Sequence, residues 1–262
     1  MERLASGMRI NRAADDAAGL GISERMRAQI RGVEQANRNI QDGISLVQTI
    51  DGVLNEVHSI LQRARELAVQ WNSGTLSWGD KAALRDEMFA LSNEIGRLED
   101  VSQFNGIMLL QDATAQVTLQ VGANDGEIIS FNLADLMGPN VGNLVRGNTF
   151  FALPWIDADV DGFDFHIDDV SAARARFGAI QNRLEHAHAN NSTYQGNLMD
   201  AESRIRDTDM AQEMTNLTRQ QLLQSAGTTM LLFASNSPAR VLDLIAGNSG
   251  SSSSPGLAAA PA

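Results

Sequence analysis

The sequence contains no cysteine, a single lysine and few aromatic residues. Without cysteine the chain can form no disulfide, no thiol nucleophile and no cysteine metal site. Because Lys81 is the only lysine, Schiff-base chemistry could use no other lysine side chain. Aromatic residues make up 5% of the chain, which is little volume for the core of a globular enzyme. These absences argue against several enzyme classes and favour long helices packed side by side.

Long apolar runs are also missing, and the charge balance is strongly acidic. No stretch reaches the roughly 20 apolar residues that span a bilayer. The first residues do not have the form of a cleaved secretory signal. A net charge of −12 would repel the phosphates of a nucleic acid. We therefore expect no membrane insertion and no nucleic-acid partner.

Residues 12–71 contain no proline and predict one long helix. Apolar residues repeat there at alternating steps of four and three, as in a coiled-coil heptad. This first stripe consists of Leu46, Ile50, Val53, Val57, Ile60, Ala64 and Leu67. A looser second stripe consists of Ile40, Ile44, Val47, Leu54, Leu61 and Ala68. A face this broad needs more than one partner helix.

A turn between Trp71 and Gly79 precedes a second predicted helix that ends near Val101. Ser77 and Asp80 have the spacing of a capping box, which marks a helix start. The second helix should therefore fold back on the first as a hairpin of helices.

Residues 103–168 follow a different pattern. Two segments of alternating polarity flank a Gly-Ala-Asn-Asp-Gly turn at 122–126, which predicts a β-hairpin at 115–135. Residues 138–168 are rich in glycine and aspartate and predict a variable acidic loop with little regular structure.

The helical period returns from Asp169. Apolar residues fit one heptad frame as far as Ile205, with Asn191 the one polar residue inside it. A further stripe is formed by Leu223, Ala226, Met230 and Phe233. Pro238 should interrupt this helix. Residues 247–262 are rich in Gly, Ser, Ala and Pro and predict a flexible tail or linker.

We thus expect a mainly α fold, in which long antiparallel helices form a rod-like bundle or coiled coil with a small β-hairpin region. About sixty helical residues make a rod about 90 Å long, which one compact domain cannot bury. The uncovered stripes predict self-association; the alternative is an isolated helical bundle. The predicted assembly seam consists of Leu46, Ile50, Val53, Val57, Ile60, Leu223, Met230 and Phe233.

Several stretches resemble bacterial flagellin. In order along the chain they are residues 2–11, 13–20, 62–70, 103–106, 120–126, 178–185, 201–207 and 225–228. The resemblance covers nearly everything except residues 138–168 and the tail. Because no large segment separates the two halves, the chain resembles a minimal flagellin without large outer domains.

The resemblance implies a non-enzymatic structural subunit of the flagellar filament that supports motility. Residues 1–20 would belong to an inner coiled-coil or spoke region, and residues 21–205 to a rod-like helical outer domain. Residues 206–246 would form a carboxy-terminal inner-core helix. The implied partners are further copies of the chain, a flagellin export chaperone, the filament cap and hook-associated proteins. The implied location is the extracellular flagellum, reached through the flagellar export apparatus.

The sequence departs from the family pattern at both ends. Flagellins have a further helical segment before the stretch that corresponds to Glu2, and the chain is expected to lack this first amino-terminal helix. Residues 247–262 have no counterpart in the family and are expected to be an added linker.

The resemblance also implies recognition by Toll-like receptor 5 on the outer helices. The matching residues are Gln62, Arg63, Glu66, Leu67 and Glu87. Arg63 and Leu67 are four residues apart and are expected to share a helix face. In the alternative interpretation Leu67 belongs to the heptad stripe and Arg63 is a solvated or salt-bridged neighbour; both can hold.

An acidic segment suggests calcium. Asp157, Asp159, Asp161, Gly162 and Asp168 occupy positions 1, 3, 5, 6 and 12 of an EF-hand loop. Aspartate at position 12 has a shorter arm than the usual glutamate. The alternative is a solvated acidic loop, and no other cofactor is indicated.

Two other non-enzymatic functions remain open at this level. A hook–filament junction (hook-associated) protein shares the terminal regions, although the motifs at 62–70 and 120–126 favour flagellin. A flagellin-like cell-surface protein that binds polysaccharide would need an aromatic platform, for which Trp71, Trp78 and Trp155 are the candidates. The histidines form no His-Glu-x-x-His motif, and no nucleophile elbow or phosphate-binding loop is present.

Overall fold

The computed structural model describes residues 1–111, 116–145 and 160–247 of the 262-residue chain. The chain divides into two compact units. The larger unit contains residues 22–202, and the smaller unit combines residues 1–21 with residues from 203 onward.

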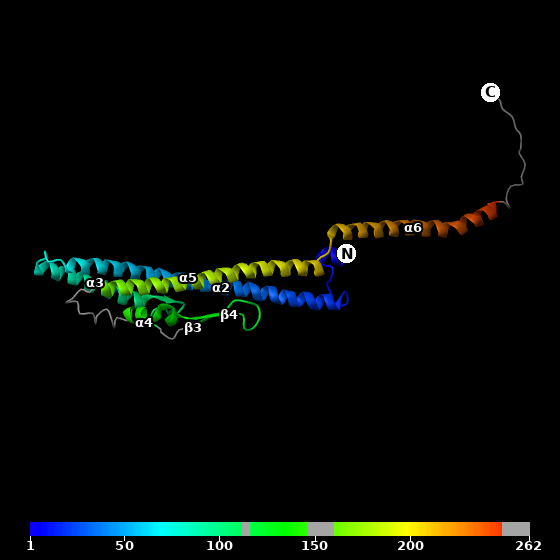
Figure 1. The fold of residues 1–262 in the computed structure, drawn as a ribbon. Helices are drawn as coiled ribbons and strands as arrows, with labels where there is room; N and C mark the ends of the chain where they lie inside the picture. The colour runs from blue at the N-terminus through cyan, green and yellow to red at the C-terminus, as the bar shows by residue number, and fades with distance from the viewer. Residues whose placement is uncertain (112–115, 146–159, 248–262) are drawn as a thin grey trace, which may run out of the picture. The chain divides into compact units, whose positions relative to one another are not determined.

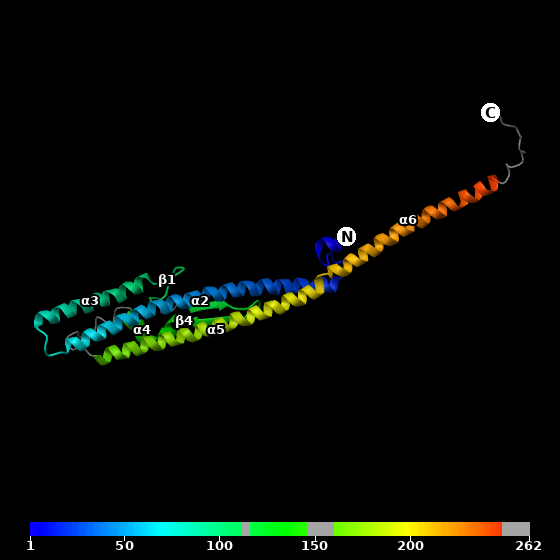
Figure 2. The ribbon, with the colours of Figure 1, turned by 90° about the horizontal axis from the view of Figure 1, so that it is seen from above.

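Three long helices build the larger unit. They are α2 (Ala17–Trp71), α3 (Trp78–Val101) and α5 (Val160–Arg206). Within this unit α2 lies alongside α5 (Figures 1 and 2). The pair is linked at the surface by Arg174–Asp51, with Nε and Oδ1 2.8 Å apart, and by Arg27–Glu202 at 3.2 Å. The predicted long helices are confirmed.

The turn between α2 and α3 is closed by the predicted capping box. The Ser77 hydroxyl accepts a hydrogen bond from the Asp80 backbone N–H, and the Asp80 carboxylate accepts one from the Ser77 N–H. Both groups satisfy donors that a helix start leaves unpaired. The start of α3 is therefore specified locally, within the four residues from Ser77 to Asp80.

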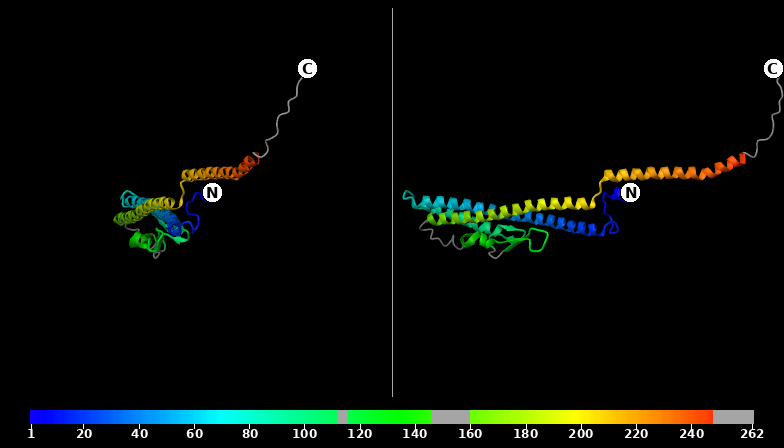
Figure 3. Two further views of the ribbon diagram at one scale, coloured as in Figure 1. Left: turned by 90° about the vertical axis from the view of Figure 1, so that its right-hand side faces the viewer. Right: turned by 45° about the vertical axis from the view of Figure 1, so that its right-hand side comes forward.

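Short strands and one broken helix cover the long helices. They are β1 (Gln103–Phe104), β2 (Ile107–Met108), β3 (Gln116–Gln120), β4 (Ile128–Asn132) and α4 (Leu133–Val145). Strands β3 and β4 pair antiparallel, with Thr118 opposite Ser130, as the alternation predicted. Within the larger unit, β3, β4 and α4 lie on one side of the long helices (Figures 1 and 3). Gly138 has a left-handed φ of 77° and breaks α4 in two.

The core of the larger unit is made from the heptad stripes. Its members are buried apolar side chains of all three helices and of the strands. From α2 they are Ile40, Leu46, Val47, Ile50, Leu54, Val57, Leu61, Ala64, Leu67 and Ala68. Helix α5 contributes Phe163, Val170, Ala173, Phe177 and Leu184. Both predicted stripes of α2 are thus buried inside the chain.

The smaller unit contains α1 (Glu2–Ser6), an antiparallel bridge between Met8 and Asp207, and α6 (Met210–Gly247). Gly7 ends α1 in the left-handed region, at φ 70°. Asp209 begins α6, because its Oδ1 accepts hydrogen bonds from the backbone N–H groups of Ala211 and Gln212.

Three sequence predictions on secondary structure were wrong. Helix α2 begins at Ala17 and not at residue 12, because the Asp15 carboxylate binds the backbone N–H groups of Asn11 and Arg12 in a turn. The acidic loop at 138–168 is partly helical, since α4 extends to Val145 and α5 begins at Val160. Helix α6 continues past Pro238 to Gly247.

Candidate functional site

The most exposed apolar surface belongs to α6. Between Met210 and Ser235, where side chains are described, no residue is buried. Its large exposed apolar side chains are Met210, Met214, Leu222, Leu223, Met230, Leu231, Leu232 and Phe233. Leu223, Met230 and Phe233 of the predicted seam are 65%, 72% and 69% exposed. Such a surface marks a site of interaction with another macromolecule.

The apolar surface continues all the way round α6 at one point. Residues 230–233 are four consecutive large apolar residues, and four residues complete a full helical turn. A helix that is apolar on every side is normally buried on every side. A single partner helix would leave half of this turn exposed.

The predicted seam on α2 does not provide such a surface. Leu46, Ile50 and Val57 are buried in the core of the larger unit, and Val53 and Ile60 pack against it while partly buried. Their partners are in α3, α5 and the strands of the same chain. This part of the predicted assembly seam is therefore corrected: it stabilises the subunit and offers little to a second copy.

Four of the five residues predicted to bind a receptor lie at the surface. Arg63 is half exposed and donates from Nη2 to Oε1 of Glu87 at 2.7 Å and from Nη1 to Oε2 of Glu66 at 3.0 Å. The bonds to Glu87 and then to Glu66 raise the pKa of Arg63. Gln62 donates a hydrogen bond from Nε2 to Nε2 of His58 at 2.9 Å. The structure thus brings α2 and α3 residues into one charged cluster.

Leu67 does not share that surface. It is fully buried in the core, although it follows Arg63 by four residues. Four residues advance a helix by slightly more than one turn, about 40° beyond the starting direction. At the edge of an apolar face this rotation is enough to separate a solvated side chain from a buried one. The predicted receptor surface therefore loses Leu67 as a contact.

The β3–β4 hairpin is seated on α2 and α5 by two asparagines. Asn39 of α2 donates from Nδ2 to the Gln120 carbonyl at 3.1 Å. Asn191 of α5 donates from Nδ2 to the neighbouring Val121 carbonyl at 2.6 Å. Asn191, the polar interruption of the heptad frame, thus has a structural role.

Two glycines of α2 allow this close approach. A Cβ placed on Gly43 would lie 2.3 Å from Cδ1 of Leu119 in β3. A Cβ placed on Gly32 would lie 2.9 Å from Cβ of Ala123 in the hairpin turn. At Gly43 the flexible end of Leu119 can give way, whereas at Gly32 the contact is with Cβ and the backbone of Ala123, so a larger side chain there would push the hairpin turn away.

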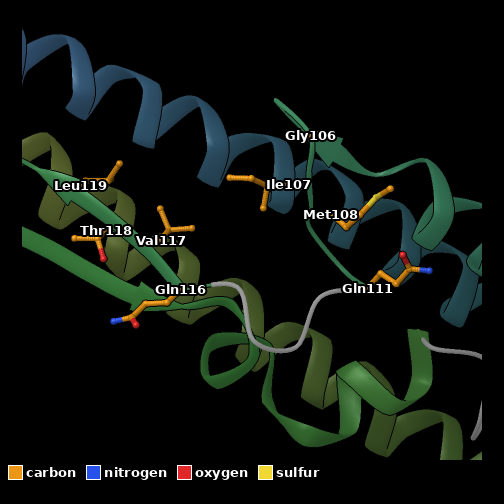
Figure 4. Close-up of a pocket in the computed structure, with 8 residues that line it drawn as sticks. All are labelled: Gly106, Ile107, Met108, Gln111, Gln116, Val117, Thr118 and Leu119. Carbon is orange, nitrogen blue, oxygen red and sulfur yellow. The ribbon is translucent and has the colours of Figure 1, made fainter.

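A groove of about 780 Å³ runs between the β1–β2 turn and β3. Figure 4 shows its lining side chains, with α2 behind them. The lining residues are Gly106, Ile107, Met108, Gln111, Gln116, Val117, Thr118 and Leu119. Among the described residues that line the groove there is no carboxylate, histidine, lysine or arginine, and these residues therefore supply no titratable group for acid–base chemistry.

The predicted calcium loop is wrong in its backbone. Asp161 and Asp168 lie in α5, and Gly162 makes no sharp turn there. Seven helical residues separate these two carboxylates by about 10 Å along the axis, too far to share one ion. Asp157 and Asp159 lie outside the described residues. Within the described ranges no three acidic or histidine side chains are arranged to hold a metal.

The tryptophans proposed for polysaccharide behave differently from one another. Trp71 packs against the core, with the Lys81 ammonium 5.5 Å from the centre of its ring. Trp78 is exposed at the first turn of α3, and Trp155 lies outside the described residues. The helices of the described ranges also lack the combination of length and hydropathy needed to cross a membrane.

The sequence did not predict the hydrogen bonds that link residues 7–9 to residues 205–208 in the smaller unit. We call this set of hydrogen bonds the joint. Arg9 donates from its backbone N–H to the Arg206 carbonyl at 2.6 Å and from Nη2 to the Ile205 carbonyl at 2.7 Å. Thr208 donates its N–H to the Gly7 carbonyl at 3.0 Å. The last carbonyls of α5 are thus satisfied by a residue 196 positions earlier. No local pattern signals such a distant pairing.

Comparison with known proteins points to one family. Residues 1–115 match the bacterial flagellin N-terminal helical region, and residues 160–245 match the bacterial flagellin C-terminal helical region. The chain is 50% identical over 245 residues to a flagellin of Halalkalibacterium halodurans, covering 94% of this chain and 90% of the relative. It is 44% identical over 278 residues to a flagellin of Bacillus subtilis, covering 94% and 91%.

A solved structure shows the same fold at low identity. It is that of a Vibrio parahaemolyticus protein described as a flagellar hook-associated protein. The TM-score is 0.62 at 14% identity, and the match covers 74% of this chain and all of that one. At this identity the likeness concerns the fold alone.

Proposed function

The chain belongs to the bacterial flagellin family and is a structural subunit of the flagellar filament, and from this premise we propose which of its surfaces serve assembly. A filament subunit assembles with further copies of itself in the extracellular flagellum. A hook–filament junction protein and a polysaccharide-binding protein are not favoured by these relatives. The mechanism is structural and includes no catalytic step.

We propose that α6 is the assembly helix. The observation that carries this proposal is the exposure of Leu223, Met230 and Phe233 on a helix with no buried side chain in its described part. Fully burying each such side chain stabilises an assembly by about 1.5–3 kcal/mol. The larger unit supplies a preformed rigid body, because its own stripes are already covered.

Seeded polymerisation tests this proposal. The chain is added to short flagellin filament fragments, which are pelleted and imaged. We expect the unsubstituted chain to elongate the seeds, and the double variant Leu223→Ser, Phe233→Ser to stay in the supernatant as a folded monomer. Phe165→Ser removes a comparably exposed ring from the larger unit and serves as the matched control. Equal elongation by the double variant would rule out α6 as the assembly helix.

We further propose that the chain leaves the cell through the flagellar export apparatus, with a chaperone covering α6 and with the cap and hook-associated proteins as later partners. A free helix with exposed apolar side chains, and with one turn that is apolar on every side, needs a cover before assembly. The same double variant tests this: a purified flagellin export chaperone should co-elute with the unsubstituted chain and not with the variant. Equal co-elution of both would place the chaperone elsewhere.

We propose that the cluster of Gln62, Arg63, Glu66 and Glu87 is read by Toll-like receptor 5 on released subunits. What supports this is the surface position of all four side chains on two adjacent helices. Leu67 would act by holding this part of α2 in place from the core. In a receptor reporter assay Arg63→Ala should lower the signal, and Arg85→Ala on α3 is the control. Equal signals from Arg63→Ala and the unsubstituted chain would contradict the proposal.

A further inference from the structure

All sulfur in this chain is thioether sulfur. The sequence has ten methionines and no cysteine. Oxidation by a peroxide can therefore reach sulfur only at methionine, with no thiol to react first.

The structure divides the methionines by accessibility. Met88 and Met137 are 3% and 2% exposed in the core of the larger unit. Met214 and Met230 of α6 are 52% and 72% exposed. Met230 lies in the wholly apolar turn at 230–233. Met214 lines a groove on α6 together with the apolar Leu222, Leu223 and Ala226 and the polar Thr215, Thr218 and Arg219.

We propose that Met214 and Met230 are oxidation sites through which a peroxide prevents free subunits from assembling. This proposal rests on the assembly role of α6 given above. A lone pair of each thioether sulfur attacks one peroxide oxygen and the O–O bond breaks. The sulfur gains one oxygen and is oxidised to the sulfoxide, and the peroxide is reduced to water after proton transfer.

The sulfoxide opposes assembly because it is polar and would have to enter the contacts that cover the exposed apolar side chains of α6. An S=O group that enters an apolar contact without a hydrogen-bond donor carries the cost of an unpaired buried polar group. We expect the concentration needed for elongation to rise about tenfold for each oxidised site. Once α6 is covered in a filament the same sulfurs are shielded, so the sensitive state is the free subunit.

The experiment compares free subunits before and after graded treatment with hydrogen peroxide. Peptide mass spectrometry reads the sulfoxide at each methionine, and seeded polymerisation reads elongation. We expect Met214 and Met230 to oxidise well before Met88 and Met137, and elongation to fall with the first pair. The variant Met214→Leu, Met230→Leu should elongate equally well before and after treatment.

The control variant is Met199→Leu, which removes an exposed methionine of α5. It should lose elongation on oxidation as the unsubstituted chain does. Full elongation by subunits oxidised at Met214 and Met230 would overturn the proposal, as would equal inactivation of the Met214→Leu, Met230→Leu variant. Failure of unoxidised subunits to elongate seeds would instead contradict the assembly role of α6, and this proposal with it.

Discussion

The apolar stripe of α2 and the apolar stripe of α6 look alike in sequence and have opposite surroundings. Both repeat at steps of three and four. Ile50 and Leu54 of α2 are fully buried, whereas Leu223 and Phe233 of α6 are exposed. A heptad pattern therefore predicts that a face will be covered, but not whether the cover comes from the same chain. In this subunit one stripe supports folding, and the other is available for assembly.

The largest effect should come from a matched pair of phenylalanines. Phe177→Ala leaves a cavity in the core and should lower the free energy of unfolding by about 3–5 kcal/mol. Phe233→Ala, in which the ring is 69% exposed, should change it by less than about 0.5 kcal/mol. Urea unfolding of the monomer followed by circular dichroism measures both. A comparable loss in the two variants would mean that α6 is covered within the monomer.

A pair of glycines on α2 should give the next largest effect. Gly32→Ala forces a methyl group against Cβ and the backbone of Ala123 and should cost about 1–3 kcal/mol. Gly52 has no atom within 4 Å of a built Cβ, so Gly52→Ala should stabilise the helix by up to about 1 kcal/mol. Urea unfolding measures both changes. If Gly32→Ala were neutral, the hairpin turn would not be held closely against α2.

Removing the helix caps of α3 and α6 should give a smaller effect, and the effect should differ between the two units. Ser77→Ala removes the cap of α3 and should lower the stability of the larger unit by about 1 kcal/mol. Asp209→Ala removes the cap of α6 and should reduce helicity without moving the unfolding transition of the larger unit. Residue-resolved amide hydrogen exchange measures the loss of helix in α6 separately from the loss of stability in the larger unit. A shift of the main transition by Asp209→Ala would show that α6 unfolds together with the larger unit.

Acid should produce the smallest effect. Hydrogen bonds from Ser77 lower the pKa of Asp80, and those from Arg97 lower the pKa of Glu94. Because the folded state holds these carboxylates ionised, their contribution is complete above the unfolded pKa values, which are near 3.8 and 4.5. This contribution to stability is lost as the pH falls through the lowered pKa values of the folded state. Burial lowers the pKa of His166, so the unfolded state binds this proton first and the unfolding midpoint should begin to fall as the pH drops below about 6.5. The two carboxylates should add a further decrease below about pH 4, smaller in Arg97→Ala. This second decrease should be slight, because both carboxylates are exposed.

Most of the larger unit could be predicted from the sequence because its signals are local. The stripes of α2, the Ser77–Asp80 cap and the glycine-flanked hairpin turn each lie within a few residues of what they specify. The start of α5 was missed because the aspartates between Val160 and Asp169 suggested a loop. Phe163, His166 and Val170 nevertheless continue the buried face at helical spacing.

The exposure of individual side chains was harder to predict, because it depends on which other elements pack against each residue. The sequence placed Leu67 beside Arg63, and only the packing of α3 and α5 shows that Leu67 is buried while Arg63 is not. Pro238 also lies inside α6, where a helix break was predicted from the missing N–H. The close packing of Leu119 against Gly43 joins residues far apart in the sequence, so no local pattern predicts it.

The link between Arg9 and Ile205 closes a loop of nearly two hundred residues. The entropy lost on closing a loop rises only with the logarithm of its length, so doubling the loop would cost only about 0.6 kcal/mol. Segments could therefore be inserted between β4 and α5 at almost no cost to the joint that holds the two ends of the chain together. The middle of the chain could therefore change greatly in length while the hydrogen bonds between its two ends stay the same.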